Sequence, residues 1–137
     1  MSFYALSTVQ IQNRLRILPN KVKQVWLADD ATGAGSIEAL KSWWTTIIEE
    51  GTRYGYYVNG GKSWLILKNH SLLQKTENLF SDTKINITTD GKRHLGAVIG
   101  SLDFRNEKIE EWCNELNVLS EFAKSQPQAA YAAFLFW

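Results

Sequence analysis

The stretch Val25-Trp-Leu-Ala-Asp29-Asp30 places two adjacent carboxylates directly after a short apolar run. Residues 22–28 are rich in β-branched and aromatic side chains, which is typical of a strand. Side chains alternate between the two faces of a strand, so the two aspartates can share a face only if a turn follows. Small residues fill positions 31–35 and predict that turn or a short second strand.

The residues alone leave two interpretations of this pair open. One aspartate could bind a divalent cation at the tip while the other supports the turn, because carboxylate oxygens are the ligands that Mg²⁺ prefers. Acidic residues at strand ends also occur simply as turn formers, since their short side chains bond to the local backbone.

The periodicity predicts helices on both sides of this stretch. Ile37, Leu40, Trp44 and Ile47 repeat at the spacing of an amphipathic helix over residues 37–50, and Ser36 is a suitable N-cap. Further elements follow from the same rules: helices at 2–18, 71–80, 103–125 and 128–137, a strand at 63–68, and strands at 85–88 and 93–99 around Asp90-Gly91. The order predicts an α+β layer with helices on one face, followed by a helical appendage.

Composition narrows the class of protein. The chain has 137 residues, enough for one domain with a core, and its 45% hydrophobic content with only 2 prolines argues against long disorder. Cys113 is the only cysteine, so no disulfide scaffold forms within the chain. No apolar stretch approaches the ~18 residues that cross a bilayer, and no signal peptide opens the chain. We therefore expect an intracellular protein, in the cytoplasm or nucleus, without a membrane partner.

The net charge of +1 conceals a block pattern. Residues 1–28 carry four basic side chains and no acid, residues 29–50 are net acidic, 51–102 net basic and 103–137 net acidic. Basic blocks beside an acidic one suit a site where phosphates approach metal-binding carboxylates. Ordinary solvated faces would give the same pattern.

Two further motifs fail on inspection. Gly60-Gly-Lys-Ser63 ends like a phosphate loop, but Tyr56 stands where the first glycine is required, and the segment opens a strand rather than a helix. His70, His94 and Cys113 do not have the spacing of zinc ligands.

Three segments, in this order, resemble the palm of reverse transcriptases. Leu27-Ala-Asp-Asp30 is similar to the family's third palm motif, an aspartate pair at a hairpin tip. Gly55-Tyr-Tyr-Val-Asn-Gly-Gly-Lys-Ser63 is similar to the fourth motif, and Arg93-His-Leu-Gly96 to the fifth, the primer grip. The resemblance covers nearly the whole chain and points to the enzymes of retrotransposable elements.

The resemblance implies a partial polymerase palm at residues 1–101, an antiparallel sheet with helices on one face, and the start of a helical thumb at 102–137. It implies RNA-directed DNA synthesis, a nucleotidyl transfer with two Mg²⁺ ions, on an RNA template with a DNA primer and deoxynucleoside triphosphates. The implied residues are Asp29 and Asp30 as catalytic metal ligands, Lys62 as a catalytic charge stabiliser at the triphosphate, and Asn59, Leu95 and Gly96 at the substrate or primer.

The chain also departs from the family. Leu27 stands where the family usually has Tyr, and residues 1–28 lack the upstream metal-binding aspartate. The glycine-rich entry to the first helix and the fingers are absent as well. We therefore expect a truncated palm with weak or no Mg²⁺ binding and little activity alone, whose other half is lost, lies in a longer product or acts in trans.

Two alternatives remain. The chain could be a non-catalytic module derived from a retroelement, which binds nucleic acid or uses its apolar tail at 128–137 to bind a protein. A small metal-dependent hydrolase at Asp29 and Asp30 ranks lower, because no histidine or further carboxylate stands at ligand spacing.

Overall fold

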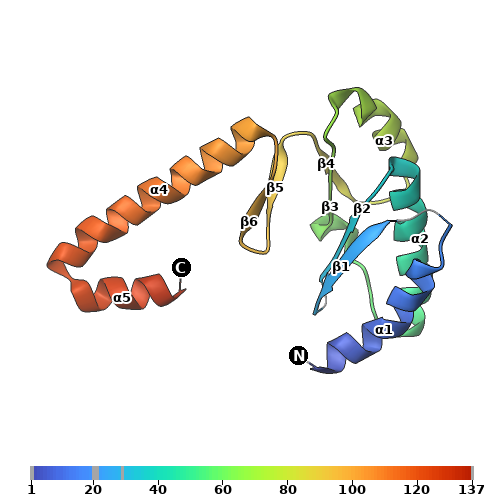
Figure 1. The fold of residues 1–137 in the computed structure, drawn as a ribbon, viewed down its shortest axis with the longest axis horizontal. Helices are drawn as coiled ribbons and strands as arrows, with labels where there is room; N and C mark the ends of the chain where they lie inside the picture. Colours follow the sequence, from blue (N-terminus) through green and yellow to red (C-terminus); the bar gives the residue numbers. More distant parts are fainter. Residues whose placement is uncertain (1, 20–21, 29, 137) are drawn as a thin grey trace. The chain divides into compact units, whose positions relative to one another are not determined.

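The computed structural model describes residues 2–19, 22–28 and 30–136, and they form a mixed α+β fold with two compact units (Figure 1). The first unit comprises residues 1–65 and 71–87, and the second comprises residues 66–70 and 88–137. The α+β class expected from the sequence is confirmed at this level, although the strands of the described residues form three two-stranded sheets. The resemblance implies a boundary between a palm at residues 1–101 and a thumb at residues 102–137. That boundary stays a prediction. Among the described helices, none has the length and apolar character needed to cross a membrane.

Helices of the first unit lie where the periodicity predicts them. They are α1 (Ser2–Arg16), α2 (Ile37–Arg53) and α3 (Leu73–Leu79). The Ser36 hydroxyl oxygen accepts a hydrogen bond from the Ala39 backbone N–H at 3.3 Å, so the predicted N-cap of α2 is confirmed. The helix runs one turn beyond the predicted end at residue 50.

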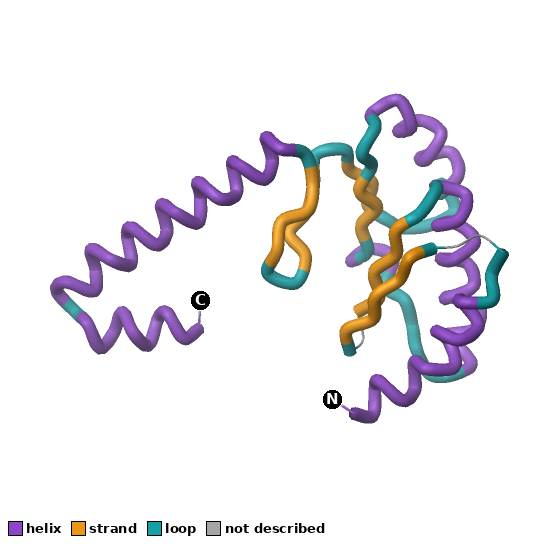
Figure 2. The backbone as a smooth tube through the Cα atoms, viewed as in Figure 1, coloured by secondary structure: helices purple, strands orange, loops and turns teal. Residues whose placement is uncertain are grey.

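The segment that contains Val25–Leu27 and Asp30 forms a tight hairpin in the first unit (Figure 2). Strand β1 (Lys23–Leu27) pairs antiparallel with β2 (Asp30–Ala34), and Leu27 lies opposite Asp30. Ala28, in the turn between them, has a φ of 54°, in the left-handed region that such short turns require. The second strand that the small residues 31–35 allowed is therefore present.

The core of the first unit lies between this hairpin and the helices, which sit on one side of β1 and β2 in Figure 1. One buried cluster joins α1 to α2 and consists of Ile11, Leu15, Trp43 and Ile47. Val22, Trp26 and Ala31 pack against it from the hairpin. A second cluster joins α2 to the segment after α3 and consists of Ile37, Trp44 and Phe80. Helix coverage of one strand face, as expected, is thus found for the β1–β2 hairpin.

The remaining short elements frame the loop that carries Lys62. A 3₁₀ turn, η1 (Gly60–Lys62), leads into β3 (Trp64–Ile66), which pairs with β4 (Asn86–Thr88). Another 3₁₀ turn, η2 (His70–Leu72), precedes α3. The glycine-lysine segment thus leads into a strand, as the sequence predicts, and not into a long helix of the phosphate-loop kind.

In the second unit, the structure corrects one predicted hairpin. The strands flank Leu95-Gly96, with β5 (Gly91–His94) paired to β6 (Ala97–Gly100), and do not flank Asp90-Gly91. Gly91 and Gly100 lie opposite each other in the ladder, and a Cβ on Gly91 would meet a ring carbon of Phe104 at 2.5 Å. Gly91 is therefore needed for close packing within a strand rather than for a turn.

Two helices follow, α4 (Leu102–Ser125) and α5 (Pro127–Phe136), which pack against each other. The Ser101 hydroxyl oxygen caps α4 by accepting from the Phe104 N–H at 3.2 Å. The guanidinium of Arg93 lies 5.4 Å from the ring centre of Trp112, which attaches β5 to α4. Most of the other apolar side chains of α4 remain exposed.

Candidate functional site

The hairpin presents Asp30 on its open face. Cross-strand partners point to the same side of a sheet, so Asp30 shares a face with Leu27, and Val25 lies on that face as well. Leu27 is 58% exposed and Val25 69%, so the helices do not cover this face. Asp29, the aspartate to which the resemblance gives the leading role, lies outside the described residues. What is described is one carboxylate at the end of a two-residue turn, on an uncovered apolar face.

Gln24 fixes the opposite face of the hairpin to α2. Its side-chain oxygen accepts hydrogen bonds from the indole N–H groups of Trp26 and Trp43, both at 3.0 Å. Trp43 belongs to α2 and is buried, so this contact connects β1 to the helix layer through a half-buried polar side chain at the edge of the core. The strand that leads to Asp30 is thereby held in position by a side chain that lies on the opposite face of the strand from Asp30.

The loop carrying Lys62 is braced at both ends. Asn59 Oδ1 accepts from the Lys62 backbone N–H at 3.2 Å, and the Ser63 hydroxyl donates to the Asn59 carbonyl at 2.9 Å. The Asn86 amide on β4 donates to the carbonyls of Gly61 and Ser63 at 2.8 and 3.2 Å. Asn59 therefore shapes this loop, while the Lys62 side chain is exposed and forms no ion pair with any described residue.

The two residues expected at the primer form the turn between β5 and β6 in the second unit. Leu95 has a φ of 50° and Gly96 a φ of 78°, so both occupy the left-handed region. Leu95 is 55% exposed, although its conformation is disfavoured for a residue with a Cβ by roughly 1–2 kcal/mol. The structure thus presents an apolar side chain at the tip of a hairpin.

The predicted site residues fall into three groups. Asn59 and Lys62 lie in one loop, Leu95 and Gly96 in one turn, and Asp30 at the tip of β2. No ion pair or hydrogen bond joins Asp30 to Lys62 in the described part of the chain.

The donor groups of the described residues do not match the implied Mg²⁺ pair. Carboxylate oxygen suits this ion. However, the described residues contain no group of three or more His, Cys, Asp or Glu side chains that could hold a metal. Asp30 alone does not make up the ligand set that two ions need, so we derive no step through the metal.

Electrostatic perturbation is found elsewhere on the first unit, where two ion pairs connect α2 to α3 and the residues after it. Lys75 lies 2.5 Å from Glu38, and its hydrogen bond holds the pKa of that carboxyl below its usual value. Lys41 likewise bonds to Asp82 and lowers the pKa of the Asp82 carboxyl. These exposed pairs support the helix layer behind the hairpin.

Comparison of the chain with protein-family models, curated proteins and solved structures finds no match.

Two positioning residues escaped the sequence analysis. Gln24 is a polar residue at an inward position of a strand, between the inward-facing Val22 and Trp26, and that break in an apolar pattern is a readable signal. Asn86 stands between Ile85 and Ile87, which is the ordinary alternation of a strand and gives no such signal. The local sequence does not disclose the partners, which lie 19 residues from Gln24 and 25 and 23 residues from Asn86.

Proposed function

We propose that the chain is a reverse-transcriptase-like palm segment whose family activity is RNA-directed nucleotidyl transfer with Mg²⁺. The β1–β2 hairpin is the observation that carries the proposal. A two-residue turn leads from Leu27 to Asp30, and the face that Asp30 shares with Val25 is open while the helices lie behind. An aspartate tip on an uncovered strand face is the arrangement that the resemblance implies for the third palm motif.

The Lys62 loop supports the same proposal by its chemistry. Asn59 and Asn86 form hydrogen bonds to the backbone of this loop. The exposed ammonium group of Lys62 therefore projects from a turn whose conformation is fixed. In the proposed role, Lys62 stabilises negative charge on the triphosphate or gives a proton to the leaving pyrophosphate. The four basic residues of positions 1–28 add a sequence-independent attraction for phosphates.

The proposal also limits what this chain does alone. The first 28 residues contain no acid, so the only carboxylates near the tip in sequence are Asp29 and Asp30. A single carboxylate cluster is a poor holder of two ions in a fixed geometry. We expect little or no synthesis by the isolated chain.

Primer extension on a primed RNA template with Mg²⁺ tests this limit. The expected result is no product above background, for the chain and for its Asp29→Asn variant alike. Robust synthesis that disappears in Asp29→Asn would overturn the argument that the carboxylate set is incomplete.

A magnesium titration followed by backbone NMR tests the tip itself. Mg²⁺ is expected to shift the amides of Ala28 and Asp30 at millimolar concentration, and Asp29→Asn should remove that shift. Asp90 provides the control, because it is an exposed acid elsewhere in the chain. Equal shifts at Asp90, or none at the tip, would count against a palm-like metal site.

A non-catalytic interaction module is the second candidate, and the exposed side chains of α4 favour it. Leu102, Ile109 and Val118 are 62, 51 and 71% exposed. Salt-dependent binding of a primer–template by Asp29→Asn, measured by fluorescence anisotropy and as tight as for the unchanged chain, would favour this candidate in its nucleic-acid form. Binding of the primer–template that is lost in Asp29→Asn would instead support the proposed reverse-transcriptase-like palm.

A further inference from the structure

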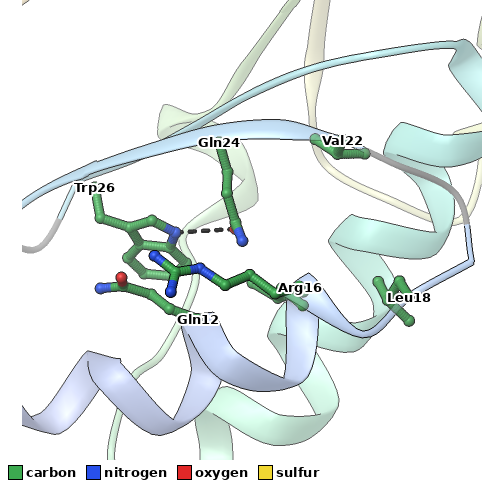
Figure 3. Close-up of a pocket in the computed structure, with 7 residues that line it drawn as sticks. Gln12, Arg16, Leu18, Val22, Gln24 and Trp26 are labelled. Atoms are coloured by element: carbon green, nitrogen blue, oxygen red, sulfur yellow. Dashed lines mark hydrogen bonds between the residues drawn. The ribbon is translucent and has the colours of Figure 1, made fainter.

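A groove of about 410 Å³ lies between α1 and β1, on the face of the hairpin opposite to Asp30. Figure 3 shows Gln12 and Arg16 extending from α1 toward Gln24 and Trp26 on β1. The remaining lining side chains are apolar: Leu15, Leu18 and Val22. The groove therefore combines an apolar floor with a few convergent polar groups, and its volume falls within the ~300–1,000 Å³ that is usual for small-molecule sites.

The orientation of the Gln24 amide is dictated by its neighbours. An indole N–H can only donate, and two of them, from Trp26 and Trp43, meet the same atom of Gln24 at 3.0 Å. That atom must be the carbonyl oxygen, and both of its lone pairs are then used. The amino group of Gln24 has no acceptor among the described residues, so it offers two N–H donors on the side that lines the groove.

Arg16 carries the only charge among the described residues that line the groove. Its guanidinium forms no ion pair within the described ranges, and no acidic residue lines the groove. The first acid of the chain is Asp29, so the whole helix α1 and strand β1 carry positive charge alone. A guanidinium fork beside an amide donor favours an anion with several acceptor oxygens.

Two further features indicate what accompanies that anion. Trp26 lines the groove, and its ring centre lies 5.7 Å from that of Tyr56, which is not among the lining residues. Gln12 donates its amino group to the Thr8 hydroxyl at 3.2 Å, which leaves its carbonyl oxygen as an acceptor. A flat indole beside a carboxamide acceptor suits a nucleobase, which stacks on aromatic rings and donates hydrogen bonds from its edge.

We infer that the α1–β1 groove binds a nucleoside monophosphate, with the phosphate at Arg16 and the Gln24 amino group and the base against Trp26. The site lies on the helix-facing side of β1, whereas the proposed metal tip lies on the other side. It does not depend on the proposed function, because its residues, its ligand and its measurement are all different.

The experiment is a titration of the ¹⁵N-labelled full chain with adenosine 5′-monophosphate, followed through the indole N–H signals. Those of Trp26 and Trp43 are expected to move, because both groups bond to the amide that meets the phosphate, whereas that of Trp112 in the second unit should stay in place. Substitution of Trp26 and Trp43 by Phe, one at a time, assigns the two signals. Unmoved Trp26 and Trp43 signals at saturating nucleotide would overturn the inference.

Partial ligands separate a nucleotide site from a bare anion site. Adenosine and ribose 5-phosphate are each expected to bind at least tenfold more weakly than the complete nucleotide. Equal affinity for ribose 5-phosphate, or for benzoate as a planar carboxylate, would overturn the inference in favour of a general anion groove. A 5′-phosphorylated trinucleotide then identifies the source: tighter binding than the free nucleotide indicates a strand end, and weaker binding indicates the free metabolite, both within the inferred chemistry.

Matched arginine variants test the assignment of Arg16. Charge-assisted hydrogen bonds of this kind are strong enough that Arg16→Gln should weaken binding about tenfold or more. Arg14→Gln removes the same charge from the same helix at an exposed position outside the groove lining, and it should change the affinity less than twofold. Equal losses in the two variants would show a diffuse charge effect and overturn the assignment.

Discussion

Replacing Gln24 by Met tests the polar contact that fixes the hairpin to the helix layer. The two side chains are similar in length, so the change removes the shared acceptor and leaves the packing volume nearly intact. Trp43 is only 7% exposed, and its N–H would lose its partner without access to water, at a cost of about 1–3 kcal/mol. Trp26 is half-buried and can rebond to water, so its loss is about 0.5–1.5 kcal/mol.

The expected total is therefore a destabilisation of about 1.5–4.5 kcal/mol. Urea unfolding followed by far-ultraviolet circular dichroism measures this loss of unfolding free energy. An unchanged m-value would show that the surface exposed on unfolding is the same in both proteins. A double-mutant cycle provides the control: in the Trp43→Phe background, Gln24→Met should cost at least about 1 kcal/mol less. A cost below about 0.5 kcal/mol, or the same cost in both backgrounds, would refute the role given to Gln24.

Two further predictions concern the second unit and the surface of the first. Gly100→Ala should cost about 1–3 kcal/mol in the same assay, because the new Cβ would overlap the Asp90 carbonyl oxygen, whereas Gly61→Ala, with ordinary contacts only, should be nearly neutral. An NMR pH titration should show the pKa of Asp82 below its usual range and rising in Lys41→Gln. Because this pKa is lowered on folding, its contribution to stability is present at neutral pH and disappears as the pH falls through it.

Helices and the first hairpin could be predicted because their determinants are local. Ser36 and the apolar repeat after it define the start and the buried face of α2 without reference to the rest of the chain. The small residues after Asp30 allow a short second strand, and the register that pairs Leu27 with Asp30 leaves room for a two-residue turn only. The position of Asp30 at the start of the second strand follows from the same local pattern, whereas the role given to the aspartate pair came from the resemblance and stays a prediction.

The second hairpin could not be predicted, because two dipeptides compete for its turn. Asp90-Gly91 is the stronger local turn signal, but Gly91 is required in the strand by the approach of Phe104 and the opposite strand. Leu95-Gly96 takes the turn at the cost of a positive φ for Leu95. The bracing of the Lys62 loop was hidden for a related reason, since Asn86 comes from a strand more than twenty residues further along the chain.

The succession of β5, β6, α4 and α5 bears on the order in which the protein assembles. Each of these elements packs against the next one along the chain, from the hairpin at residues 91–100 to the two final helices. Contacts between chain neighbours close short loops and lose little entropy before they form, so such regions fold in microseconds to milliseconds. By contrast, β3 can pair with β4 only after a loop of about twenty residues has closed. Residues 91–136 are therefore expected to acquire structure early, before the Lys62 loop is locked in place.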